Sequence, residues 1–169
     1  MNLKEMRAFG DDSMRLRPIE RADIDMLRLW RNRDDARKWF KDTQRVEAAQ
    51  QLRWYDRYLS RSDDIMFAVT SNSVSVGFVA IYDADEATQS AEIGRFLVCP
   101  DHQGQGHMFH ACRLVIQTCR EVLALSYLRL SVHNENIRAI ALYRRHGFIE
   151  VAAMDSGFSA MQLKLAPTR

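Results

Sequence analysis

Two glycines, at positions 104 and 106, stand where the chain could hold an anion. They follow an apolar run, Ile93–Cys99, which predicts a largely buried strand, and a helical pattern of about fifteen residues comes after them. Glycines let a backbone approach a ligand closely, and the first N–H groups of a helix lack intrahelical acceptors. The stretch therefore predicts an anion-binding turn. An ordinary strand–turn–helix connection would have the same composition.

The elements around this turn predict one α/β domain. Residues 1–13 are expected to form a loose arm, and the domain is expected over residues 14–169. Gly147 stands where the C-terminal cap of a helix belongs. The order of elements favours a single, largely antiparallel sheet. Hydrophobic periodicity predicts strands over 14–18, 64–70, 74–82, 91–99, 127–132, 148–153 and 160–165, and helices over 20–31, 34–40, 46–60, the residues after 106, and 136–146.

Composition excludes several classes of protein. A length of 169 residues favours one domain, and a net charge of +2 is too small to indicate a nucleic-acid partner. No apolar run approaches the roughly 20 residues of a membrane span, and the first residues lack the apolar core of a signal peptide. Three cysteines without zinc-ligand spacing indicate reduced core thiols. We therefore expect a cytoplasmic protein without a membrane or nucleic-acid partner.

Two motifs together resemble the GNAT superfamily of acetyl-CoA-dependent N-acetyltransferases. The first is the glycine turn, Gln103–Met108, and the second is Asn136–Tyr143 followed by Gly147-Phe148. The second motif matches the family pattern at every fixed position. Met108 departs from the first pattern, which has a small residue there, so the ligand is expected to sit differently at that point. The resemblance covers residues 14–165 and implies a GNAT-like α/β fold, with about seven mostly antiparallel strands and four or five helices.

The resemblance also implies the cosubstrate and its contacts. Acetyl-CoA is expected to bind without a metal, with its pantetheine arm along the backbone of the central strand and its pyrophosphate in the glycine turn. Asn136 is expected to contact the same arm. The residues assigned to this cosubstrate are Leu97, Val98, Cys99, Gln103, Gly104, Gln105, Gly106, His107, Met108, Asn136, Ala139 and Tyr143.

Catalysis requires that the acceptor amine lose a proton and that the departing thiolate gain one. Tyr143 matches the family tyrosine that acts as general acid, and a core aromatic would have the same helical spacing. Glu92, eleven residues before Gln103, matches the general base of some members, and a structural salt bridge is the alternative. Ser131 replaces another branch's glutamate base, and His133 is a reserve base.

The first half of the chain is expected to select the acceptor, a small-molecule amine. It is similar to the branch that acetylates nucleotide-linked amino sugars, of the pseudaminic-acid pathway type. Aromatic rings can stack on a base or sugar, and arginine can pair with a diphosphate. Two alternatives remain: a ribosomal-protein-type N-terminal acetyltransferase and a non-catalytic acetyl-CoA sensor. A homodimer is also an open expectation. The acceptor residues are predicted to be Trp30, Arg31, Asn32 and Trp54.

Overall fold

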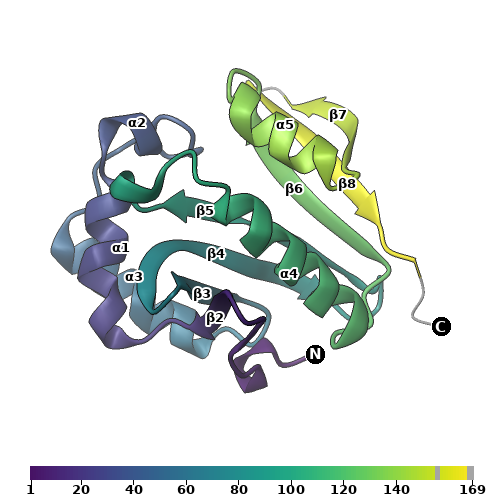
Figure 1. Cartoon of the computed structure of the whole chain (residues 1–169), viewed down its shortest axis with the longest axis horizontal. Helices are drawn as coiled ribbons and strands as arrows, with labels where there is room; N and C mark the ends of the chain where they lie inside the picture. The colour runs from purple at the N-terminus through teal and green to yellow at the C-terminus, as the bar shows by residue number, and fades with distance from the viewer. Residues whose placement is uncertain (155–156, 167–169) are drawn as a thin grey trace.

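The computed structural model describes residues 1–154 and 157–166. Within them, one sheet has the strand order β1-β2-β3-β4-β5-β6-β8-β7 (Figure 1). Its strands are β1 Phe9–Gly10, β2 Met14–Pro18, β3 Ile65–Ser71, β4 Val74–Asp85, β5 Ser90–Val98, β6 Tyr127–His133, β7 Ile149–Met154 and β8 Phe158–Lys164. The helices are α1 Ile24–Arg31, α2 Asp34–Arg37, α3 Ala48–Ser60, α4 His107–Glu121 and α5 Ile137–Arg145, with 3-10 turns η1 Leu3–Glu5, η2 Arg21–Asp23 and η3 Pro100–His102. The structure confirms the predicted α/β fold around one mixed, mostly antiparallel sheet.

Two apolar cores lie on opposite faces of the sheet. The larger core packs α4 against strands β2 to β6, with Cys112 and Cys119 fully buried in it. Burial raises the pKa of both thiols, so they stay protonated. The second core packs α1 and α3 against β3, β4 and β5. The predicted reduced core thiols agree with this placement, because the described cysteines are all free and buried.

The first thirteen residues are packed, so the prediction of a loose arm is wrong. Leu3 is fully buried, and the ammonium of Lys4 lies 3.1 Å from the ring centroid of Tyr58. Phe9 meets Phe67 edge to face with centroids 5.1 Å apart, and β1 adds an eighth strand beside β2. The sequence does not predict this packing, because two isolated apolar residues, Leu3 and Phe9, form no periodic pattern.

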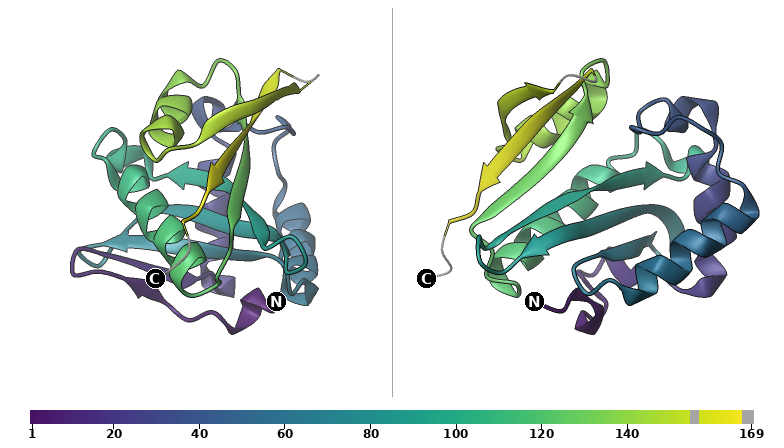
Figure 2. Two further views of the ribbon diagram at one scale, coloured as in Figure 1. Left: turned by 90° about the vertical axis from the view of Figure 1, so that its right-hand side faces the viewer. Right: turned by 180° about the vertical axis from the view of Figure 1, so that it is seen from behind.

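Among the described strands, one neighbouring pair is parallel, and the sheet divides there. β5 pairs with β6 only through Ser90–Glu92, opposite Tyr127–Arg129. Beyond Glu92 the two strands diverge, and β6, β7, β8 and α5 incline away from the other strands (Figure 2). One edge of β5 is consequently left without a partner strand along its second half.

A bulge in β5 accompanies this divergence. Phe78 of β4 pairs with Leu97, and Ala80 pairs with Gly94, so β5 carries one extra residue between them. Arg95 in the bulge has a φ of 52°, in the left-handed region that few non-glycine residues adopt. Because the bulge shifts the alternation of side chains, Ile93 belongs to the α4 core and Leu97 to the opposite core.

The remaining differences concern element ends. The helix predicted over 20–31 is divided into η2 and α1, where buried Asp23 accepts two hydrogen bonds of 2.7 Å from Arg17. The helix predicted over 34–40 ends at Arg37, and β4 continues three residues beyond Tyr82. In the part of the chain that the structure describes, none of the helices is long and apolar enough to cross a membrane.

Candidate active site

A cleft of about 1440 Å³ opens where β5 and β6 diverge. The unpaired half of β5 forms one wall, and the start of α5 forms the opposite wall. The glycine turn and the first residues of α4 close one end. The segment 35–42, with α2, lies over the other end and includes Trp39, whose ring is 5.5 Å from that of His133 on β6. The cleft therefore joins the two motifs, which are 28 or more positions apart in the sequence.

The glycine turn has the backbone conformation that an anion site needs. Gly104 has a φ of 76° and Gly106 a φ of 81°, and a Cβ at either position would meet no heavy atom within 4 Å. Glycine is therefore required by the backbone conformation and not by lack of space. Gly106 is the N-cap of α4, so the N–H groups of His107, Met108 and Phe109 form the first turn at the cleft. This open, donor-rich end fits a pyrophosphate.

Met108 is the residue of the turn that departs from the family pattern, and the different position of the ligand expected from its size stays a prediction. Its side chain packs against β4 at Gly77, where a Cβ would lie 2.5 Å from Met108 Cε and 2.5 Å from the carbonyl oxygen of Leu97. The absence of a side chain at Gly77 gives the methionine its space. The Met108 side chain thus finds space against β4, while the residue still lines the cleft.

The other residues assigned to the cosubstrate divide into two groups. Leu97 and Val98 line the cleft, whereas Cys99 and Gln105 do not. The Oε1 of Gln105 instead accepts hydrogen bonds from the ring nitrogens of His102 and His107, over 3.3 and 3.2 Å. Gln103 lines the cleft, and its amide donates to Asp35 of α2 over 3.1 Å. The turn is thereby connected to the segment that covers the acceptor end.

Asn136 and Ala139 face the cleft from the start of α5. Asn136 is the N-cap of this helix, and its Oδ1 accepts a hydrogen bond of 3.2 Å from the Ala139 N–H. The cap occupies the oxygen, so the amide NH₂ of Asn136 is the group available to a ligand.

Tyr143 lies at the closed side of the cleft, where it is 7% exposed. Its ring meets Phe96 and Phe148 edge to face, with centroids 5.6 and 6.0 Å away. Burial raises the pKa of its hydroxyl, so the group keeps its proton at neutral pH. A buried, protonated hydroxyl in a ligand cleft can donate to a developing thiolate.

Glu92 lines the same cleft from β5 and is half-buried. It lies opposite Tyr82 of β4, which sequence reasoning missed. Burial first, and then the negative charge of Glu92, raise the pKa of Tyr82. Tyr82 covers Gly94, where a Cβ would lie 2.8 Å from the phenol oxygen. The reserve base His133 is not among the residues lining the cleft, and its Nδ1 accepts from the backbone of Glu135.

The four predicted acceptor residues separate into two pairs. Trp30 packs against Phe78 in the second core with ring centroids 5.4 Å apart, and Asn32 exchanges two hydrogen bonds with the backbone of Val46. Neither lines the cleft or the smaller pocket beside it, because Trp30 packs against the core and Asn32 ties the end of α1 to the backbone of Val46. Arg31 lines the cleft, and both Arg31 and Trp54 line a smaller adjoining pocket.

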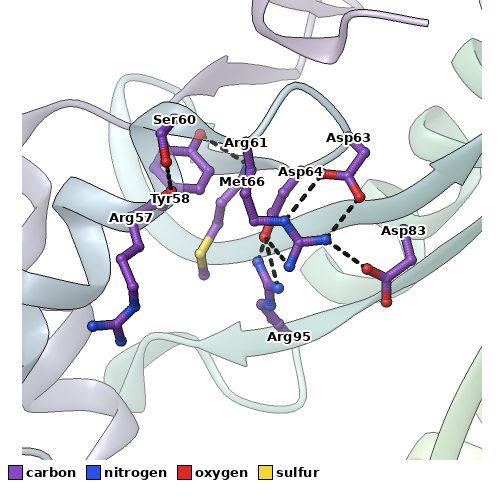
Figure 3. A network of polar contacts seen from close by, with 9 residues as sticks. All are labelled: Arg57, Tyr58, Ser60, Arg61, Asp63, Asp64, Met66, Asp83 and Arg95. Carbon is purple, nitrogen blue, oxygen red and sulfur yellow. Dashed lines mark hydrogen bonds and ion pairs between the residues drawn. The ribbon is translucent and has the colours of Figure 1, made fainter.

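Arg95 separates the cleft from this second pocket and was also missed. It makes two hydrogen bonds, of 2.7 and 2.9 Å, to Asp64, whose carboxylate is buried at the start of β3 (Figure 3). Arg61 joins the same group by contacting Asp63 and Asp83. The guanidinium of Arg95 lies 4.3 Å from the ring of Tyr82. The network thus holds the bulge of β5 from beneath.

Comparison with known proteins agrees with this geometry. Residues 13–149 match the family model described as the acetyltransferase (GNAT) domain. Spermidine N(1)-acetyltransferase of Escherichia coli (strain K12) is 31% identical over 138 residues, which is 80% of this chain and 73% of the relative. Spermidine N-acetyltransferase from Vibrio cholerae in complex with CoA and spermine has a TM-score of 0.81 at 20% identity, covering 91% of this chain and 96% of its own. A dodecameric structure of the Vibrio cholerae enzyme has a TM-score of 0.74 at 21% identity, covering 91% and 95%.

The chain therefore belongs to the GNAT acetyltransferase family. It is an acetyl-CoA-dependent N-acetyltransferase. Within the described residues, no group of three or more His, Cys, Asp or Glu side chains is arranged to hold a metal ion.

Proposed function

We propose that this enzyme acetylates a primary amine of a small molecule by direct transfer within one cleft. The observation that carries the proposal is that Glu92, Tyr143 and the glycine turn all line the cleft between β5 and β6. A turn that fits a pyrophosphate at one end and titratable groups along the walls is what a ternary complex requires.

The residues divide the chemistry as follows. Glu92, directly or through water, takes the proton that the acceptor amine must lose before its nitrogen attacks the thioester carbonyl. A C–N bond forms, the C–S bond breaks, and the Tyr143 hydroxyl supplies a proton to the departing thiolate. Leu97 and Val98 present the unpaired edge of β5 to the pantetheine arm, in the manner of an added strand.

A polyamine is the first class of acceptor to expect. The relative of 31% identity is a spermidine acetyltransferase, and polyamines carry several cationic amines. The main cleft offers carboxylates on both walls and on its covering segment, which can pair with such an acceptor. These acidic residues are Asp35, Asp42, Asp83, Glu92 and Glu135.

A nucleotide-linked amino sugar is the second candidate, and one observation favours it. Of the described residues, five arginines but only one acid, Asp42, line the smaller pocket beside the cleft. That charge balance suits a diphosphate and opposes a polycation. The homodimer expected from the sequence remains a prediction beside either acceptor.

A screen of acceptors tests the proposed function. Thiol release from acetyl-CoA would be measured with spermidine, a UDP-linked amino sugar and an N-terminal peptide, each at the same concentration. We expect turnover with a small-molecule amine well above that with the peptide. Preference for the peptide, or no thiol release above hydrolysis with any amine, would contradict the proposal.

Replacing Glu92 tests its role as base. The Glu92→Gln enzyme keeps the side-chain shape but cannot accept a proton, so we expect kcat/KM to fall by about 10²-fold or more near neutral pH. The activity should recover partly at high pH, where the free amine is more abundant. A pH–rate profile that superimposes on that of the unchanged enzyme would remove Glu92 from this role. Glu121→Gln, at an exposed acid of α4 that lines neither cavity, is the matched control.

A further inference from the structure

A second pocket of about 550 Å³ adjoins the cleft on the side of the first half of the chain. It lies between α1, α3, the segment 40–46 and the end of β5, and it shares Arg31 and Arg95 with the cleft. Apolar side chains form part of its lining, including Leu27, Met66 and Leu97. A ligand whose amine lies in the cleft can therefore extend into this pocket.

Two arginines on α3 face the pocket without a partner. Arg53 and Arg57 are one helical turn apart and share one face of α3 with Trp54. Both are exposed, and the structure gives neither guanidinium a hydrogen bond or ion pair among the described residues. Figure 3 shows the guanidinium of Arg57 apart from the network around Asp64. These two charges are therefore available to a ligand.

Arg31 enters the same pocket from the end of α1. It donates one hydrogen bond to the backbone carbonyl of Asp42, and its guanidinium lies 4.3 Å from the ring centroid of Phe40. Its Nη1 is buried and has no hydrogen-bond partner. A buried cationic donor without an acceptor is unfavourable, and an anion in the pocket would satisfy it.

The rest of the lining is neutral or already paired. Arg95 is balanced by Asp64, and Trp54 is held by stacking on Tyr58 with centroids 5.3 Å apart. Asp42 is the one acid among the described lining residues. The excess positive charge thus comes mainly from the arginines of α1 and α3, and a polyamine would be repelled.

We propose that this second pocket is a binding site for a phosphate-bearing anion. Planar guanidinium groups bind phosphoryl oxygens through two parallel hydrogen bonds, and Arg31, Arg53 and Arg57 all line this partly apolar pocket. The phosphate is either part of the acceptor molecule or a separate small anion beside it. Only the first of these sources rests on the proposed function, since binding itself requires no turnover.

A binding experiment tests the site without catalysis. Inorganic pyrophosphate would be titrated calorimetrically into the full chain saturated with CoA, so that the glycine turn is already occupied. We expect one binding site, weakened roughly tenfold by each of Arg53→Gln and Arg57→Gln, because charge-assisted hydrogen bonds are strong. Arg15→Gln, at an exposed arginine of β2 outside both cavities, is the matched control. No binding, or equal binding by the double variant, would overturn the proposal.

A kinetic experiment then identifies the source of the phosphate. The rate of acetylation would be measured with and without pyrophosphate, while the concentration of an amine that the enzyme acetylates is varied. Competition with the amine would assign the pocket to the acceptor's own phosphate. Inhibition or activation at saturating amine would assign it to a separate anion. If no amine is acetylated, the proposed function fails while the calorimetric result still stands.

Discussion

The Tyr143→Phe enzyme is expected to lose at least about 10²-fold in kcat and to bind acetyl-CoA as tightly as the unchanged enzyme. General acid catalysis contributes roughly 10²–10⁴-fold. The substitution removes only the hydroxyl and keeps the ring that packs against Phe96 and Phe148. Single-turnover rates and calorimetric titration of acetyl-CoA would measure the two quantities separately.

The matched control for this experiment is Tyr127→Phe, on β6 and outside the cleft. It should change neither kcat nor the affinity for acetyl-CoA. If Tyr143→Phe retains its kcat, water or another donor protonates the thiolate, and Tyr143 is a packing residue. A loss of acetyl-CoA affinity equal to the loss of rate would likewise show that the hydroxyl binds and does not donate.

Asp64→Asn is expected to lower the free energy of unfolding by about 2–3 kcal/mol. Removing one partner of a buried ion pair costs roughly 3–5 kcal/mol. We expect the lower value because Arg95 is about one quarter exposed and can be partly solvated. The substitution keeps the size of the side chain, so lost charge is the main cause. The midpoint and slope of urea unfolding would measure the change.

Asp63→Asn provides the control for this prediction. Asp63 is adjacent and pairs with Arg61, but both side chains are well exposed. Exposed ion pairs contribute about 0–1 kcal/mol, so we expect little change. Equal unfolding free energies for the two variants would show that Asp64 does not hold the bulge.

Asp64→Asn should also raise the KM for the acceptor, because Arg95 separates the cleft from the second pocket.

Local sequence patterns predicted most of the elements and the residues proposed to bind the cosubstrate. The run before Gly104 and the helical spacing after Gly106 predicted β5 and α4, because alternation and capping act over a few residues. The spacing of Asn136, Ala139 and Tyr143 placed all three on one side of α5, facing the cleft. The family resemblance supplied the acetyl-CoA chemistry that these elements serve.

Tertiary structure alone decided the acceptor side. Trp30 and Trp54 both pack against the second core, yet only Trp54 also lines the smaller pocket. Tyr82 and Arg95 become site residues because β4 and β5 pair with a bulge, and no local pattern records that register. The pairing of Arg95 with Asp64 spans 31 residues and depends on how β3 and β5 are placed.

Within the glycine turn, too, some features follow from the local sequence and others from tertiary packing. Positive φ angles at Gly104 and Gly106 are a local requirement, so the sequence alone was enough to predict the glycine turn. The direction of the Met108 side chain instead depends on Gly77, a residue 31 positions earlier against which it packs. Backbone conformation is encoded locally, whereas the direction in which a side chain finds space is settled by packing between distant strands and helices.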